Sequence, residues 1–219
     1  MYLNFHSHIV DDHPESITFY SIDLRKGESE KSKGHFRCIG VHPWWINQID
    51  TNNYEELREL LSGSEFLCIG EIGLDRSFKS IPFEKQIDIF ELQLRIAIER
   101  DDKFVVIHCV KAYQDILRCV HNVGFKGALV FHDYNGSPDV TRKLIDRGDY
   151  FSYGSKLFNL KTKAMKSLKI IPLERLFIET DDQLEFNIKD AYNRASEVLG
   201  LTPSELAKQC LKNFEMLQE

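Results

Sequence analysis

The stretch Phe66–Asp75 reads FLCIGEIGLD and places a carboxylate, Glu71, directly after an apolar run typical of a buried strand. A carboxylate in such a position is hard to bury without a partner, which favours a metal ligand. The alternative interpretation of Glu71 is an acidic turn after a strand. Other side chains that bind metals also stand at or next to the ends of β-favouring runs. The full set is His6, His8, Glu71, His108, His132 and Asp181. Because a parallel barrel gathers the carboxyl ends of its strands at one rim, we expect these side chains to converge there on metal.

The rest of the chain alternates strand and helix patterns. Eight β-rich runs occur, at Tyr2–Phe5, Ile17–Leu24, Phe36–Val41, Phe66–Glu71, Phe104–His108, Ala128–His132, Tyr150–Tyr153 and Leu176–Glu179. Helical patterns occupy most of the later gaps, at Asn53–Leu61, Phe83–Arg100, Ala112–Val123, Pro138–Arg147 and Thr162–Leu168, and a last helix begins after Thr202. This order predicts an α/β fold of the TIM type, a (β/α)₈ barrel, as one domain over residues 1–219.

The first connections of this barrel are short. About ten residues separate the first two runs, and the next connection, Arg25–His35, is charged and rich in Gly and Ser. Neither gap accommodates a crossover helix of normal length. We therefore expect a trimmed barrel whose first one or two outer helices are missing or vestigial, with an open flank that self-association would cover.

Composition excludes several classes of protein. The 219 residues are 42% hydrophobic and 11% aromatic, which argues against disorder. A net charge of -6 argues against a strongly basic nucleic-acid-binding surface but not against a nuclease, since bound cations supply positive charge locally. Five scattered cysteines without a CxxC pair indicate a reducing compartment, most simply the cytoplasm. We see no signal peptide and no apolar run long enough to span a membrane.

The histidine and aspartate positions differ in how strongly each indicates a metal site. His6 and His8 lie two apart on a strand and so project to the same face, although such a pair alone is as often incidental. A lone histidine such as His108 or His132 is more often a hydrogen-bonded core residue than a metal ligand. Here two histidines follow apolar runs in successive strand–helix units, as Glu71 does, and this repetition favours metal binding over coincidence. Asp181 is suited to binding metal and accepting a proton from water, a role that Asp182 would also fit.

His42-Pro43 ends the third run, because proline cannot donate to a strand ladder. We expect His42 to face the pocket mouth and contact a substrate phosphate. Trp44 and Trp45 follow, and either stack on a nucleobase or pack under a loop.

In six elements the chain resembles the TatD-related metal-dependent DNase family of amidohydrolase-like metallohydrolases, and the resemblance runs from end to end. These elements are His6-Ser7-His8, Gly40-Val41-His42-Pro43, Gly70–Asp75, Ile107-His108, His132–Gly136 and Glu179-Thr180-Asp181. The helix that starts at Thr202 and runs through Phe214 also looks like the last helix of that family.

The resemblance implies a TIM-barrel hydrolase with one or two divalent ions, of which Zn²⁺, Mg²⁺ and Mn²⁺ are candidates. It implies that His6, His8 and Asp181 hold one ion, that His108 and His132 hold the other, and that Glu71 bridges them. The implied reaction is hydrolysis of a phosphodiester, typically in DNA, by metal-activated water. Asp181 and Glu71 would be catalytic, and His42 would contact the substrate.

The chain also departs from the family pattern. The family usually has an arginine two residues after the fifth-strand histidine, where this chain has Val110 followed by Lys111. A family aromatic after the Gly-Leu-Asp motif is Arg76 here, and we expect Arg76 or Lys111 to replace the missing phosphate contact. Two alternatives stay open: a metallohydrolase acting on a small non-nucleic-acid ester, amide or phosphoester, and a non-enzymatic barrel that keeps metal for stability or binding.

Overall fold

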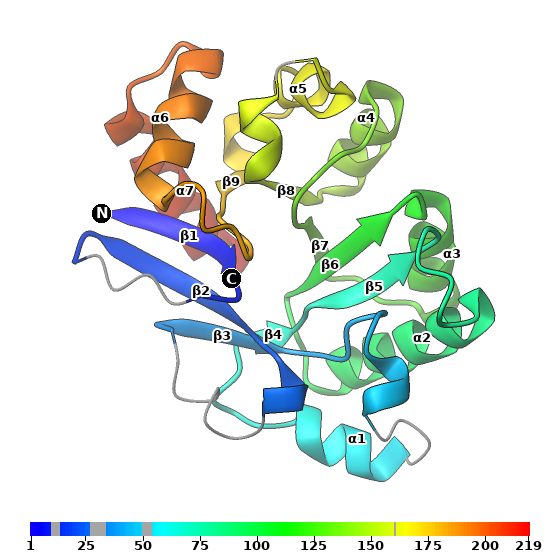
Figure 1. Ribbon diagram of the computed structural model, residues 1–219. Coiled ribbons are helices and arrows are strands. Elements are labelled where there is room, and N and C mark those ends of the chain that lie inside the picture. The colour runs from blue at the N-terminus through cyan, green and yellow to red at the C-terminus, as the bar shows by residue number, and fades with distance from the viewer. Residues whose placement is uncertain (10–13, 27–33, 50–53, 160) are drawn as a thin grey trace. The chain divides into compact units, whose positions relative to one another are not determined.

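The computed structural model describes residues 1–9, 14–26, 34–49, 54–159 and 161–219 (Figure 1). The chain divides into two compact units. Unit 1 comprises Met1–Tyr20 and Val130–Glu219, and unit 2 comprises Ser21–Leu129. The expectation of a single domain over residues 1–219 stays a prediction.

Unit 1 is built on parallel strands that come from both ends of the chain. Strand β1 (Tyr2–Ser7) pairs in parallel with the start of β2 (Ser16–Ile22). The end of β7 (Ala128–Phe131), β8 (Tyr150–Tyr153) and β9 (Leu176–Ile178) form a parallel ladder with β8 in the middle. A parallel bridge between Ser7 and Asp181 joins β1 to the segment after β9. The ends of β1 and β9 therefore lie side by side.

Two C-terminal helices cover β1 and β9. They are α6 (Ile188–Leu199) and α7 (Pro203–Leu217), each begun by a capping box, at Asn187 and Thr202. Below them the ring of Phe5 stacks on that of Phe177, with centroids 4.1 Å apart, and both side chains are buried. The remaining helices of unit 1 are α4 (Pro138–Arg147), α5 (Lys163–Leu168) and the short 3₁₀ turns η4 (Ser155–Phe158) and η5 (Leu173–Arg175).

Unit 2 contains two parallel strand pairs. Strand β3 (Phe36–Ile39) pairs with β4 (Cys68–Ile69), and β5 (Ile72–Asp75) pairs with β6 (Phe104–Val110). The helices are α1 (Tyr54–Leu61), α2 (Phe83–Glu99) and α3 (Tyr113–Val123), with 3₁₀ turns η1 (Leu24–Lys26) and η3 (Ile46–Gln48).

Two buried glutamines of α2 complete the hydrogen bonds of strand ends in unit 2. The amide of Gln93 accepts from the Val41 N–H at 2.6 Å and donates to the Val41 carbonyl at 3.1 Å. Gln86 does the same for Asp75, at 2.9 and 3.2 Å. Because a buried backbone group without a partner is costly, these amides let β3 and β5 end inside the protein.

The expected helices agree closely with the structure. Helix α4 has the predicted bounds, and α2, α3 and α5 differ by one residue at an end. Helix α6 was not predicted, although Asn187 and Asp190 are a cap pair of the expected kind. Within the predicted run Phe66–Glu71, only Cys68–Ile69 is a strand, β4, and β5 (Ile72–Asp75), which was not predicted, follows it. His108 lies inside β6 and not at its end.

The early connections are described only in part. Among the described residues before α1 there is no α-helix, and the helical turns there are the 3₁₀ turns η1 and η3. Residues 10–13, 27–33 and 50–53 lie outside the described residues, so the trimming of the barrel stays a prediction. Within the described part of the chain, no helix is both long and apolar enough to cross a bilayer.

Candidate metal centre

Unit 1 brings together three of the predicted ligands. His6 comes from β1, His132 follows β7 by one residue, and Asp181 follows β9 by three. One ligand atom of each lies within 4.8 Å of those of the other two. The rings of His6 and His132 have centroids 4.2 Å apart, although 126 positions separate the two residues in sequence. The predicted proximity of His6 and His132 is therefore confirmed.

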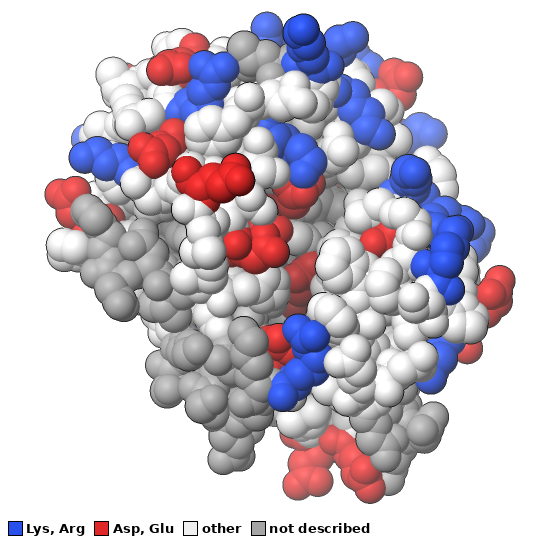
Figure 2. All heavy atoms as spheres, in the orientation of Figure 1, with Lys and Arg blue, Asp and Glu red and all other residues white. Residues whose placement is uncertain are grey.

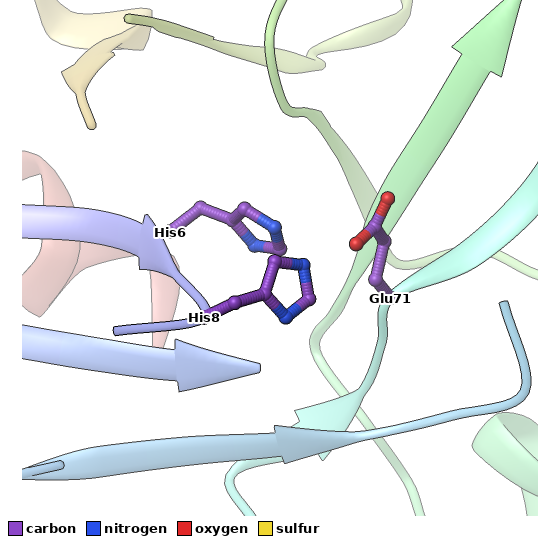
Figure 3. Close-up of side chains that lie close together, drawn as sticks. All are labelled: His6, His8 and Glu71. Carbon is purple, nitrogen blue, oxygen red and sulfur yellow. The ribbon is translucent and has the colours of Figure 1, made fainter. Parts of the chain in front are cut away.

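His8 faces the same carboxylate as His6. The Asp181 Oδ1 atom lies 3.7 Å from His6 Nε2 and 3.7 Å from His8 Nε2. Figure 3 shows both imidazoles leaving the end of β1 in the same direction. Asp182, the alternative to Asp181, is exposed and accepts a hydrogen bond from Gln183. The structure thus places Asp181, and not Asp182, beside the histidines.

The backbone of Asp181 is held by β1. Its N–H donates to the His6 carbonyl at 3.0 Å, and its carbonyl accepts from the His8 N–H at 3.1 Å. One residue earlier, the Thr180 N–H donates to the buried amide of Asn4 at 3.0 Å. Because these bonds tie the segment after β9 to β1, the carboxylate and the two imidazoles are positioned by one ladder.

Unit 2 contains a second group, formed by His42, Glu71 and His108. The Glu71 Oε1 atom lies 2.9 Å from His108 Nδ1 and 3.2 Å from His42 Nε2. We predicted Glu71 and His108 as ligands and His42 as a contact to substrate. The structure shows His42 against Glu71, so it stands within reach of the same centre, and its role toward substrate stays a prediction.

The glycines on either side of Glu71 allow close approach of the neighbouring strand. A Cβ on Gly70 would lie 2.7 Å from the Val106 side chain. A Cβ on Gly73, whose φ is +149°, would lie 1.9 Å from the His108 carbonyl oxygen. Both positions therefore require glycine for β6 to bring His108 against Glu71.

Asp75 is a site residue that sequence reasoning missed. Its carboxylate accepts from Trp44 Nε1 at 2.8 Å and from the Ser77 N–H at 2.8 Å, and lies 3.6 Å from His108 Nε2. Burial raises the pKa of Asp75, but the neighbouring His108 ring and the hydrogen bonds from Ser77 and Trp44 outweigh it and hold the pKa well below its usual range. The available signal was the Gly-Leu-Asp motif, which we used only for the family resemblance.

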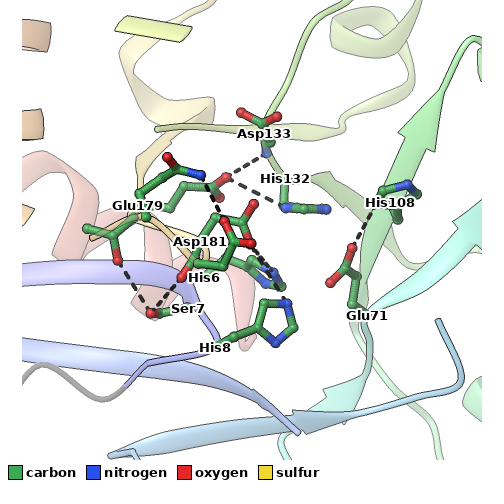
Figure 4. A network of polar contacts seen from close by, with 12 residues as sticks. His6, Ser7, His8, Glu71, His108, His132, Asp133, Glu179 and Asp181 are labelled. Atoms are coloured by element: carbon green, nitrogen blue, oxygen red, sulfur yellow. Dashed lines mark hydrogen bonds and ion pairs between the residues drawn. The ribbon is translucent and has the colours of Figure 1, made fainter. Parts of the chain in front are cut away.

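Glu179 is a second residue to which we gave no role. It is fully buried just after β9, and its Oε1 accepts from the Asp133 N–H at 2.6 Å. The same oxygen lies 3.7 Å from His132 Nδ1 (Figure 4). Burial raises the pKa of Glu179, but the neighbouring His132 and His6 outweigh it, so the pKa of the carboxyl is lowered.

Of the two residues predicted to contact substrate, Arg76 is engaged by an acidic side chain and Lys111 is exposed. The Arg76 guanidinium pairs with Asp115 at 2.7 Å and lies over the Phe83 ring at 4.0 Å. Lys111 is exposed and has a φ of +56°. Their roles toward substrate stay predictions.

The two tryptophans make contacts within unit 2. The Trp44 ring stacks on Phe78, and its indole N–H is bound to Asp75. The Trp45 ring lies under the Arg25 guanidinium at 3.5 Å. These are the packing contacts that we expected as the alternative to nucleobase stacking, which stays a prediction.

The donor set fits a divalent ion of the first transition row. Imidazole nitrogens together with carboxylate oxygens, within 4.8 Å of one another and largely shielded from solvent, are the ligands that Zn²⁺ and Mn²⁺ take in hydrolases. The cluster does not identify the metal. Figure 2 shows both Asp and Glu side chains and Lys and Arg side chains on the face that it displays.

Comparisons with known proteins show the family of the chain. The fold and the cluster are those of a metal-dependent hydrolase. The family model described as TatD related DNase matches residues 16–219, and the chain belongs to this family.

Individual relatives support the assignment. The chain is 27% identical over 211 residues to the uncharacterized metal-dependent hydrolase YcfH of Escherichia coli, covering 90% of this chain and 78% of the relative. It is 32% identical over 146 residues to the 3'-5' ssDNA/RNA exonuclease TatD of Escherichia fergusonii, covering 65% of this chain and 55% of that protein. The chain spans 58% and 63% of the length of two further curated relatives.

A solved structure shares the fold. The crystal structure of a TatD family hydrolase from Entamoeba histolytica matches with a TM-score of 0.82 over 99% of this chain and 97% of that one, at 15% identity. The α/β fold with parallel strands is therefore that of TatD structures, which belong to the TIM-barrel family.

Proposed function

We propose that this chain is a divalent-metal-dependent phosphodiesterase that hydrolyses nucleic acid, a TatD-type nuclease. The observation that carries the proposal is the meeting of His6, His132 and Asp181 from three separate strands, within 4.8 Å of one another. Family membership adds the class of reaction, and the relative named as a 3'-5' ssDNA/RNA exonuclease suggests single-stranded DNA or RNA as substrate.

The proposed ligand set is the one that the family resemblance implies. His6, His8, Glu71, His108, His132 and Asp181 would hold the one or two divalent ions. When bound, divalent ions lower the pKa of water and neutralise charge on phosphoryl oxygens. The Asp181 carboxylate, whose backbone is hydrogen-bonded to β1, would accept the proton of the attacking water.

The protein itself supplies the remaining contacts. His42, held beside Glu71, is proposed to face a phosphate of the substrate. A net charge of -6 leaves little general attraction for nucleic acid, so recognition depends on local cations. Lys111 is exposed, and Arg76 is half-exposed although paired with Asp115.

A test compares two neighbouring aspartates. Chelator-treated protein reloaded with Zn²⁺, Mn²⁺ or Mg²⁺ should cleave labelled single-stranded DNA, RNA or a nitrophenyl phosphodiester. We expect Asp181→Asn to lower kcat by about 10²–10⁴-fold, as for loss of a general base. The exposed neighbour Asp182 is the matched control, and Asp182→Asn should leave kcat within about twofold, a change too small to reflect loss of such a group.

Activity that survives both chelator and Asp181→Asn would refute the proposal. The engagement of Arg76 by Asp115, together with Val110 in the place of the family arginine, favours one alternative, a metallohydrolase of small esters, amides or phosphoesters. Hydrolysis of carboxylic esters by metal-loaded protein that leaves DNA and RNA intact would establish that alternative.

A further inference from the structure

Glu179 is a fully buried residue whose carboxylate lies close to both the Asp133 N–H and the His132 ring. Its Oε1 accepts from the Asp133 N–H at 2.6 Å and faces His132 Nδ1 at 3.7 Å. Its Oε2 is buried and accepts no hydrogen bond from the described residues. A buried charge is costly unless nearby positive charge or donors compensate it. The compensation for Glu179 comes from the segment that carries a candidate ligand.

The geometry assigns the two ring nitrogens of His132 to different tasks. Figure 4 shows Nδ1 turned toward Glu179 and the opposite edge of the ring, which carries Nε2, turned away from it. A neutral imidazole has one N–H and one lone pair, and a carboxylate next to Nδ1 favours the proton there. The lone pair then stands on Nε2, where a metal ion needs it.

We propose that Glu179 is a positioning residue that holds His132 as its Nδ1–H tautomer and so presents Nε2 as the ligand atom. The inference rests on the proposed function only in that His132 is taken as a ligand. Glu179 acts on His132 in two ways, because one oxygen fixes the backbone just after the histidine and also faces its ring. Asp133, with φ +38°, lies in the turn at which the chain leaves β7.

A purely structural role would be anchorage of this turn through the Asp133 N–H alone. Glu179→Gln separates the two roles, since the amide oxygen can still accept from that N–H while the negative charge facing Nδ1 is lost. Partners of this kind that lie behind a ligand histidine typically change metal affinity 10–100-fold.

The first measurement needs no metal and no activity. Long-range ¹H–¹⁵N spectra of the chelated protein, at a pH where imidazoles are neutral, report which nitrogen of each histidine carries the proton. His132→Gln identifies the His132 signals among the eight histidines. We expect the Nδ1–H tautomer in the wild type and a larger Nε2–H fraction in Glu179→Gln. A folded wild type with His132 as Nε2–H would overturn the proposal without any substitution at Glu179.

The second measurement is metal affinity by competition with a chromophoric chelator. We expect Glu179→Gln to weaken Zn²⁺ binding about 10–100-fold. Asp149→Asn is the control, since Asp149 is also fully buried in unit 1 but lies before β8 and pairs with Arg147. That variant should lose stability while keeping the His132 tautomer and the affinity for Zn²⁺.

The outcomes separate this inference from the proposed function. Unchanged tautomer and affinity in Glu179→Gln would reject the inference even if the enzyme cleaves DNA. Conversely, a wild type that binds Zn²⁺ with the expected tautomer but hydrolyses no phosphodiester would reject the proposed function and leave the role of Glu179 intact.

Discussion

At the scale of single residues, a buried carboxylate faces a ring nitrogen of a candidate ligand histidine in each unit. Glu179 faces His132 in unit 1, and Asp75 lies 3.6 Å from His108 Nε2 in unit 2. Neither acid was recognised from the sequence, because an Asp or Glu after an apolar run looks the same whether it binds metal, orients a ligand or ends a strand. Only the contacts of each carboxylate distinguish these roles.

The lowered pKa of Asp75 predicts how the free energy of unfolding changes at acidic pH. Its pKa is lower in the folded than in the unfolded protein, so it contributes stability that is fully present above the unfolded pKa of about 3.9 and is lost as pH falls toward the folded pKa. In chelated protein at pH 7, Asp75→Asn should lower the free energy of unfolding by about 1–3 kcal/mol. Urea denaturation should show this difference shrinking below about pH 4. A difference that is the same at pH 7 and pH 3 would contradict the assignment.

At the scale of elements, the contact between β5 and β6 depends on Gly73. The register places Gly73 opposite His108, and the space beside Gly73 is filled by the carbonyl oxygen of His108. Any side chain there would push β6 away and move His108 from Glu71. The glycine therefore links strand pairing to the geometry of the candidate ligands.

Gly73→Ala should lower the free energy of unfolding by about 2 kcal/mol or more, from backbone strain and the clash with the His108 carbonyl. Gly124, at the end of α3, is the matched control because it also has a positive φ, +77°, but nothing within 4 Å of its added Cβ. Gly124→Ala should cost only about 1 kcal/mol. Equal losses for both variants in urea denaturation would show that the close approach at Gly73 carries no energetic weight.

At the scale of the whole molecule, metal binding should stabilise the fold, because the ligands of unit 1 come from β1, β7 and β9 and are brought together only by folding. Saturation at about 100 times the dissociation constant adds about 2.7 kcal/mol, which raises Tm by about 5–10 °C for a chain of this size. Chelated and Zn²⁺-loaded protein can be compared by calorimetry.

A pair of histidine variants tests whether this stabilisation comes from the candidate centre. His6→Gln should abolish most of the Zn²⁺-dependent shift in Tm. His121→Gln, at an exposed position on α3, should preserve it. If Zn²⁺ shifted Tm equally in the wild type, His6→Gln and His121→Gln, the stabilising ion would bind at a site that does not include His6.

The alternation of strands and helices and the bounds of α4 were determined by the sequence alone, because strand and helix periodicity and helix capping are local properties. The candidate ligands were proposed from the order of the motifs and from the family that this order resembles. The sequence did not determine that Asp181 and not Asp182 would face the histidines, or that Glu179 would stand behind His132. Those outcomes depend on contacts between segments distant in sequence, such as the bridge from Ser7 to Asp181 and the hydrogen bond from Asp133 to Glu179. Long-range pairing of this kind leaves no periodic trace in the chain, so only the tertiary structure decided it.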